Sequence, residues 1–325
     1  MTGAAGFLGS HFVRTLVAGG YPALADAEVV ILDKLTYAGN LANLPGALDE
    51  PRLRFVRGDV ADPTDVEGAV DGVDSIVHFA AETHVDRSIE GGGEFVRANV
   101  DGTHTLLDAA RRAGVARFVH VSTDEVYGSI TEGSFTEDDP LRPSSPYSAS
   151  KAGADLIVQA YHRTHDAPVT LARLCNAYGP HQHPEKVIPR FVTNLLDGRP
   201  VPLYGDGRNV RTWMHVDDSC RAVQLVLERG RAGEIYNVGG GPELTNLELT
   251  ERLLAACGAG WDRVRFVADR KGHDRRYSLD WTKIRTELGF TPRFDFETGL
   301  AETVRWYAEN RAWWEPLARP VPTQL

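Results

Sequence analysis

The stretch that decides the fold stands at the start of the chain, where residues 1–16 read MTGAAGFLGSHFVRTL. Gly3, Gly6 and Gly9 give the spacing G-x-x-G-x-x-G, a variant of the glycine fingerprint that cradles the pyrophosphate of a dinucleotide. Such a loop joins a buried strand to the N-terminus of a helix, and residues 11–17 have the apolar pattern of that helix. Since a full strand should precede the loop, we expect the natural chain to begin about four residues earlier.

Outward from this loop, strand patterns alternate with helix patterns. Buried strands are predicted at residues 28–33, 53–58, 74–80, 117–122 and 169–174. Helices are predicted at residues 99–113, 148–165, 245–257 and 298–310. This alternation predicts an α/β protein with a Rossmann-type doubly wound parallel sheet.

Composition excludes several classes of protein. The net charge of −10 disfavours binding to nucleic acid, and no apolar run approaches the roughly 18 residues of a membrane span. Cys175, Cys220 and Cys257 form no C-x-x-C pair, which favours a reducing cytoplasm over a disulfide framework. His181 and His183 stand close together without an evident third ligand, so no metal site is expected.

An acidic residue at the end of the second strand supports a dinucleotide site. Asp33 follows Gly9 by 24 residues, where a carboxylate accepts hydrogen bonds from an adenosine ribose and repels a 2′-phosphate. Asp59 and Val60 end the next strand, where an adenine could rest. A glycine-rich turn or a solvated acid would explain each feature alone, but together they favour NAD over NADP.

The chemical site is predicted from two further motifs. Residues 122–128 read STDEVYG and follow a buried strand, at the edge of a parallel sheet where ligands bind. Tyr147 and Lys151 form Y-x-x-x-K, and residues four apart share one helix face. We expect the ammonium to lower the phenol pKa and to hold the cofactor ribose. The phenolate could then take a proton from an alcohol while hydride leaves for nicotinamide.

With these motifs the chain resembles the extended short-chain dehydrogenase/reductase family, most closely its dTDP-glucose 4,6-dehydratases. The resemblance covers essentially the whole chain, through TGAAGFLGSH, HFAAETHVDRS, VSTDEVYGS, SPYSASKAGAD, NAYGPHQHPEK and PLYGDGRNVRTW. It implies an NAD-binding domain at 1–175 and a smaller C-terminal α/β domain at 176–325, mainly for the nucleotide sugar, with some segments returning to the first. It also implies a homodimer joined by a four-helix bundle of the helices at 99–113 and 148–165.

The resemblance further implies a reaction. Tyr147 removes the proton of the sugar 4-hydroxyl while C4 passes hydride to NAD, and Thr123 hydrogen-bonds that oxygen. Glu125 then acts as base at C5, and Asp124 protonates the departing 6-hydroxyl. Hydride returns to C6, so that NAD stays tightly bound and is regenerated each turnover. The product is dTDP-4-keto-6-deoxyglucose, and the scheme needs a protonated Asp124 beside an ionised Glu125.

Binding residues follow by position from the same resemblance. The cofactor would be bound by Gly3, Gly6, Phe7, Leu8, Gly9, Asp33, Lys34, Thr36, Gly39, Asp59, Val60, Phe79, Ala80, Ala81, Ala98, Tyr147, Lys151 and Ala177. The sugar nucleotide would be bound by Thr83, Thr123, Asn176, Glu185, Lys186, Val187, Pro202, Tyr204, Arg211, Asn246, Arg270 and His273. The chain departs from the family at Ala98, Ala177 and Ser219, where Thr, Asn and His are usual.

Two other interpretations are weighed against this one. A C4 epimerase, or another nucleotide-sugar dehydratase of the same family, would share the glycines, the tyrosine and the lysine, but an epimerase would lack the pair Asp124 and Glu125. A non-catalytic NAD-sensing protein could dispense with Tyr147 and Lys151, and both are present. The base, the deoxysugar pathway and the end product stay open. The aromatic residues Trp306, Tyr307, Trp313 and Trp314 are expected to serve packing rather than ligand stacking.

Overall fold

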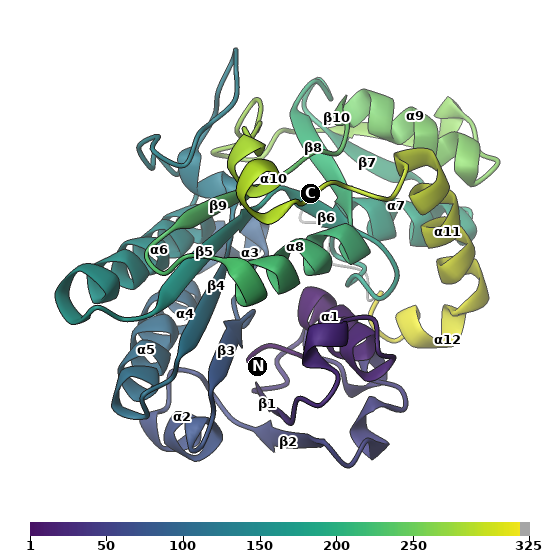
Figure 1. The fold of residues 1–325 in the computed structure, drawn as a ribbon. Helices are drawn as coiled ribbons and strands as arrows, with labels where there is room; N and C mark the ends of the chain where they lie inside the picture. Colours follow the sequence, from purple (N-terminus) through teal and green to yellow (C-terminus); the bar gives the residue numbers. More distant parts are fainter. Residues whose placement is uncertain (319–325) are drawn as a thin grey trace.

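A computed structural model describes residues 1–318, and its centre is a parallel sheet (Figure 1). Four strands pair side by side, in the order β3 (Ser75–His78), β4 (Arg117–Thr123), β5 (Val169–Leu174) and β9 (Ile235–Val238). β1 (Val29–Asp33) pairs in parallel with β2 (Leu53–Arg57). The backbone of Thr2 bridges Leu32 in β1 and His78 in β3, both in parallel. Thr2 therefore stands where the strand before the glycine loop was predicted.

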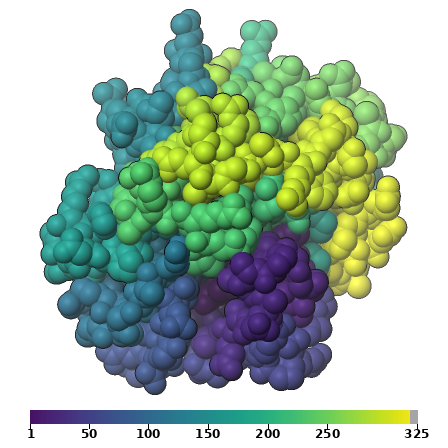
Figure 2. Space-filling model, in the orientation of Figure 1, coloured from purple at the N-terminus to yellow at the C-terminus, as the bar shows by residue number. Residues whose placement is uncertain are grey.

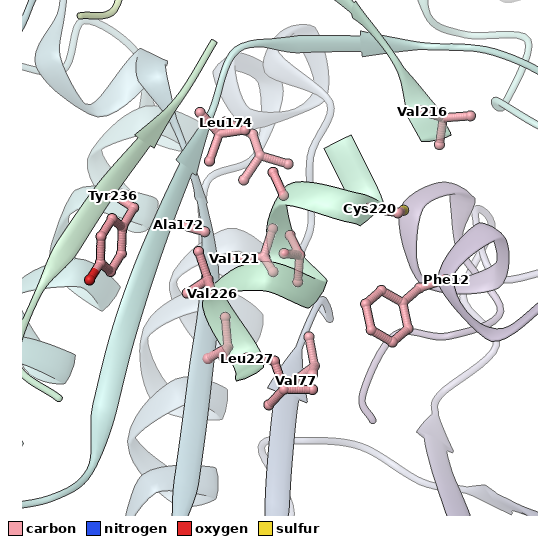
Figure 3. Packing of buried hydrophobic residues seen from close by; sticks show 14 of the residues in the cluster. Phe12, Val77, Val121, Ala172, Leu174, Val216, Cys220, Val226, Leu227 and Tyr236 are labelled. Carbon is pink, nitrogen blue, oxygen red and sulfur yellow. The ribbon is translucent and has the colours of Figure 1, made fainter. Parts of the chain in front are cut away.

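Helices cover both faces of this sheet, which confirms the predicted doubly wound α/β fold (Figure 1). One face holds α1 (Phe7–Val17) and α8 (Val216–Arg229), and the other holds α2 (Pro63–Val70), α5 (Gly102–Arg112) and α6 (Pro146–His165). Figure 3 shows the first interface, where Val226 of α8 lies near Val121 of β4 and Ala172 of β5, and Cys220 of α8 points toward α1. These side chains are almost wholly buried.

Helix α6 begins with a complete capping box. The Ser145 side chain accepts a hydrogen bond from the Ser148 amide at 3.1 Å, and the Ser148 hydroxyl accepts one from the Ser145 amide at 3.0 Å. Pro146 fits the first helical position because its missing N–H has no partner there. The cap fixes the start of the helix, so Tyr147 and Lys151 both fall on its buried face.

A second core lies beyond residue 176. Its cluster of buried apolar side chains runs from Tyr178 to Trp314. Around it lie β6 (Asn176–Tyr178), α7 (Val187–Leu196), β7 (Val201–Tyr204), β8 (Val210–His215), β10 (Glu243–Thr245), α9 (Asn246–Ala256), β11 (Val264–Val267) and α11 (Phe296–Glu309). The chain returns to the first core in α8, β9 and α10 (Thr282–Leu288). Residues 319–325 of the expected second domain lie outside the described part of the chain.

Short helical turns complete the secondary structure. They are η1 (Pro22–Leu24), η2 (Leu41–Asn43), η3 (Ala47–Asp49), α3 (Val85–Glu90), α4 (Gly93–Phe95), η4 (Val96–Asp101), η5 (Asp124–Tyr127), η6 (Trp261–Arg263) and α12 (Arg311–Trp314). The single helix predicted at 99–113 is wrong at its start, since η4 is a π-helical turn that leads into α5. Within residues 1–318, no helix has both the length and the apolar character needed to span a membrane.

Candidate active site

The glycine-rich loop is built for close contact with a ligand. Gly3 has φ +67°, and a Cβ placed there would lie 2.5 Å from the backbone nitrogen of Ala80. A Cβ on Gly9 would lie 2.5 Å from the carbonyl oxygen of Gly3, so only glycine lets α1 start this near the loop. Apart from its chain neighbours, a Cβ placed on Gly6 would have one atom of residues 1–318 within 4 Å, the carbonyl oxygen of Gly3 at 3.2 Å. The loop thus leaves open backbone at a helix N-terminus, as a pyrophosphate requires.

Asp33 holds this loop against the end of β1. Its carboxylate accepts hydrogen bonds from the backbone amides of Ala5 and Leu35, both at 2.8 Å. Burial raises the pKa of Asp33, and the two amide hydrogen bonds oppose that rise. The next strand end is also fixed, because Asp59 lies 2.9 Å from Lys34 Nζ.

A cavity of about 340 Å³ opens beside the loop. Every predicted cofactor-binding residue except Lys151 lines this first cavity. One part of its wall is open glycine backbone, which suits a pyrophosphate, and another part has acidic residues at strand ends, which suit a ribose. The cavity therefore fits a dinucleotide. The residues present therefore suit the NAD expected from the sequence.

A second cavity, of about 180 Å³, adjoins the first. Every predicted substrate-binding residue lines it except Thr123, which lines the first cavity. Glu125, Asn176 and Lys186 line both cavities, so the two meet at the STDEVYG segment. Here the Arg270 Nε atom is buried and has no hydrogen-bond partner within residues 1–318, as a site for an anionic ligand would leave it.

Asp124 is the most strongly perturbed acid at this junction. Its side chain is 2% exposed, and burial together with the neighbouring charge of Glu125 raises its pKa to about 8. Oδ1 accepts a hydrogen bond from the Thr123 hydroxyl at 3.3 Å. Oδ2 is buried without a partner in the described residues. The raised pKa favours the neutral form of Asp124, although Asp124 does not itself line either cavity.

Glu125 lies in a different electrostatic environment from its neighbour. Burial raises its pKa, but the positive charges of Arg270, Arg211 and Lys186 act in the opposite direction. Arg211 lowers the pKa of Asp124, and the charge of Glu125 raises it. Both carboxyls have a raised pKa, but Glu125 has three cations that favour its charged form.

The expected effect of Lys151 on the Tyr147 phenol is not seen in this structure. Lys151 Nζ donates to the carbonyl oxygen of Val121 at 2.8 Å instead of facing the first cavity. Burial raises the pKa of Tyr147 well above its ordinary value, and the charge of Glu125 raises it further, while the Thr123 side chain lowers it. Burial alone accounts for the direction, because the deprotonated phenol is the charged form.

Some residues of the site were not found from the sequence. Trp313 was expected to serve packing, yet it also lines the first cavity, and its Nε1 donates to Asn43 Oδ1 at 2.9 Å. Asn43 in turn donates to the carbonyl oxygen of Ala5 in the glycine loop at 2.8 Å. Figure 2 shows the C-terminal segment beside the N-terminal one on the same face. No local motif marks Trp313, because it reaches the loop only through the tertiary fold.

A second group of unpredicted residues surrounds Glu185 between the two cavities. Tyr37 donates to Glu185 Oε1 at 3.0 Å, and the Arg87 guanidinium lies 3.8 Å from the centre of the Tyr37 ring. His181 and His183 both line the first cavity. Within residues 1–318 there is no group of three or more His, Cys, Asp or Glu side chains arranged to hold a metal ion.

Comparison with known proteins gives consistent results. A family profile described as GDP-mannose 4,6 dehydratase matches residues 1–303. A dTDP-glucose 4,6-dehydratase from Streptomyces niveus is 59% identical over 320 residues, covering 98% of this chain and 95% of that protein. The crystal structure of dTDP-glucose 4,6-dehydratase from Streptomyces venezuelae with NAD bound has a TM-score of 0.96 and 64% identity, covering 97% of this chain and 98% of that one. The enzyme of the same name from Bacillus anthracis, in complex with NAD, has a TM-score of 0.89 and 44% identity, with the same coverage of 97% and 98%.

Proposed function

The chain belongs to the GDP-mannose 4,6 dehydratase family, and we propose that it is an NAD-dependent dTDP-glucose 4,6-dehydratase, a hydro-lyase of nucleotide-sugar metabolism. Membership confirms the resemblance drawn from the sequence motifs. The product is dTDP-4-keto-6-deoxyglucose.

One observation supports elimination of water most directly. Asp124 precedes Glu125, which lines both cavities; Asp124 has a pKa of about 8, and its Oδ2 has no partner within residues 1–318. Loss of the 6-hydroxyl needs a proton donor, and removal of the C5 hydrogen needs a base, at the same moment of the reaction. An Asp whose raised pKa favours its neutral form, beside a Glu whose charged form is supported by three cations, would supply both groups.

The cofactor residues named above would hold NAD in the first cavity, where it supplies a hydride acceptor for C4 and a hydride donor for C6. The chain's own residues manage the protons. Tyr147 accepts the proton of the 4-hydroxyl. The Thr123 side chain lowers the pKa of the Tyr147 phenol, and it orients the oxygen of the 4-hydroxyl. Glu125 takes the C5 proton, and Asp124 protonates the departing hydroxyl. Asp124 and Tyr147 are buried, while Thr123 and Glu125 line the first cavity.

The substrate residues suit a diphosphate. The Nε atom of Arg270 is buried and has no hydrogen-bond partner within residues 1–318, and its Nη1 atom lies 3.8 Å from Asp86 Oδ1. The Arg211 guanidinium is held rigidly, with Nη2 donating to the carbonyl oxygen of Asp274 at 2.9 Å and the Tyr277 ring centre 3.9 Å away. A fixed guanidinium clasps phosphate oxygens with little loss of entropy. The division into an NAD-binding part and a sugar-nucleotide part is proposed on the same grounds.

The proposal is tested by incubating the purified protein, without added NAD, with dTDP-glucose, UDP-glucose and GDP-mannose in parallel. We expect the dTDP sugar alone to lose the mass of one water molecule at a useful rate. A product of unchanged mass with inverted C4 would indicate an epimerase. Loss of water only from the UDP or GDP sugar would reject the proposed base.

Two further features complete the proposal. We place the enzyme in the cytoplasm, in keeping with its three free cysteines. We also propose a homodimer through a four-helix bundle that involves α6 and the helix formed by η4 and α5. Leu156 of α6 and Val96 of η4 support it, because they are large apolar side chains that are 58% and 50% exposed.

A further inference from the structure

A cluster of buried polar side chains lies next to Lys151, and the proposed reaction does not use it. It consists of His120, Asp155 and Arg173, which are 0%, 0% and 1% exposed. Asp155 follows Lys151 by four residues on α6, as Lys151 follows Tyr147, so all three lie along one face of the helix. His120 comes from β4 and Arg173 from β5.

Only one oxygen of Asp155 is used by its ion pair. Arg173 Nε donates to Asp155 Oδ2 at 2.8 Å. Asp155 Oδ1 has no hydrogen-bond partner in residues 1–318, and it lies 3.5 Å from His120 Nε2. That same Nε2 atom lies 3.5 Å from Lys151 Nζ. A single imidazole nitrogen therefore stands between the ammonium and the unsatisfied carboxylate oxygen.

The charges around Lys151 leave Asp155 as its counter-ion. The groups that interact with it are His78 from β3, His120 from β4 and Asp155 on its own helix, and Arg173 from β5 acts on His120. Burial lowers the pKa of His78 to about 3 and that of His120 well below its ordinary value, so both rings are neutral. Burial also lowers the pKa of Lys151 to about 8, and Asp155 is the group that opposes this shift.

We propose that Asp155 is a positioning residue of the active site, whose carboxylate charge acts across the His120 ring to keep Lys151 a charged ammonium on the helix face that carries Tyr147. This rests on the proposed function for the role of Lys151, but the charge state of Lys151 is measurable without any turnover. Without the Asp155 carboxylate, Lys151 and Arg173 would be two buried cations with no counter-ion, and the lysine is the one able to lose its proton.

The direct test is a pH titration of Lys151, in which NMR of lysine-labelled protein monitors the Cε carbon next to the side-chain nitrogen. The chain has only five lysines, and Lys151→Met assigns the signal. We expect Asp155→Asn to lower the Lys151 pKa by about one unit or more. Arg173→Met breaks the same ion pair but keeps the carboxylate, so the Lys151 pKa should not fall. A merely structural role would make both variants behave alike.

Asp218→Asn is the matched control, because Asp218 is also fully buried and paired with Arg221, at 2.9 Å, yet is not among the groups that face Lys151. It should leave the Lys151 titration unchanged. If Asp155→Asn does not fold, the double variant with Arg173→Met is compared with Arg173→Met alone. The inference is overturned if removing the carboxylate leaves the lysine titration in place, or if Arg173→Met lowers it equally.

Activity gives a second readout. In Asp155→Asn the alkaline limb of the kcat profile should move to lower pH by the shift seen in the lysine titration. If the wild-type protein does not dehydrate dTDP-glucose, the proposed function fails while the NMR result still decides the role of Asp155. If dehydration proceeds but its alkaline limb does not follow the lysine, Asp155 does not act through Lys151.

Discussion

At the scale of single residues, the proposed function depends on two adjacent carboxyls, Asp124 as acid and Glu125 as base. Asp124→Asn with Glu125→Gln keeps both side-chain shapes but removes the acid and the base. We expect dehydration to fall by about 10²-fold or more, while oxidation at C4 persists. The appearance of reduced nicotinamide without release of a 6-deoxy product would show this. Tyr147→Phe is the control, since it should abolish both steps, and full dehydration by the double variant would refute the assignment.

The raised pKa of Asp124 also predicts how stability depends on pH. The folded chain holds a proton on Asp124 up to about pH 8, whereas the unfolded chain releases it near about pH 4. Because the folded state binds the extra proton in that window, this residue makes the free energy of unfolding decrease as pH rises from 4 to 8. Asp124→Asn should remove that contribution, so the variant gains stability over the wild type as pH rises. Urea titrations across the window measure this, and parallel curves for the two proteins would contradict it.

At the scale of elements, the glycine loop shows how tightly strand, turn and helix are joined. In Gly3→Ala, the new Cβ would clash with the Ala80 nitrogen, 2.5 Å away, and alanine would be held in a left-handed conformation. Together these should lower the free energy of unfolding by about 2 kcal/mol or more. We expect lower thermal stability and loss of bound NAD on gel filtration. Gly19→Ala is the control, because Gly19 also has positive φ but no atom within 4 Å of the new Cβ. Equal effects of the two substitutions would mean that the contact with Ala80 is unimportant.

Elements with a strong local pattern were predicted closely, and those that depend on distant contacts were not. The strand at 169–174 is found at those residues because six buried side chains in a row leave no other assignment. The π-helical turn at 96–101 was missed, since an unbroken helix pattern does not reveal a register change. The cavity residue Trp313, and Tyr37 beside the cavity residue Glu185, were missed because each is brought to the site by a partner far away in sequence, Asn43 and Glu185 respectively. For the same reason the contact between Lys151 and Val121 could not be foreseen.

At the scale of the whole molecule, the exposed apolar side chains predict how two copies meet. Ile89, Val96 and Leu156 come from α3, η4 and α6, and both α3 and η4 contact α6 in the fold. Placing Glu at both Val96 and Leu156 would bring like charges together across a two-fold interface and bury them without partners. We expect the dimer to weaken by about two orders of magnitude or more, so that analytical ultracentrifugation at micromolar concentration finds a monomer. Phe266→Glu is the control, because Phe266 is 61% exposed on β11, in the second core region, and its substitution should leave the dimer intact. A wild-type protein that sediments as a monomer would refute the proposed dimer. A dimer that survives both glutamates but not Phe266→Glu would place the interface elsewhere.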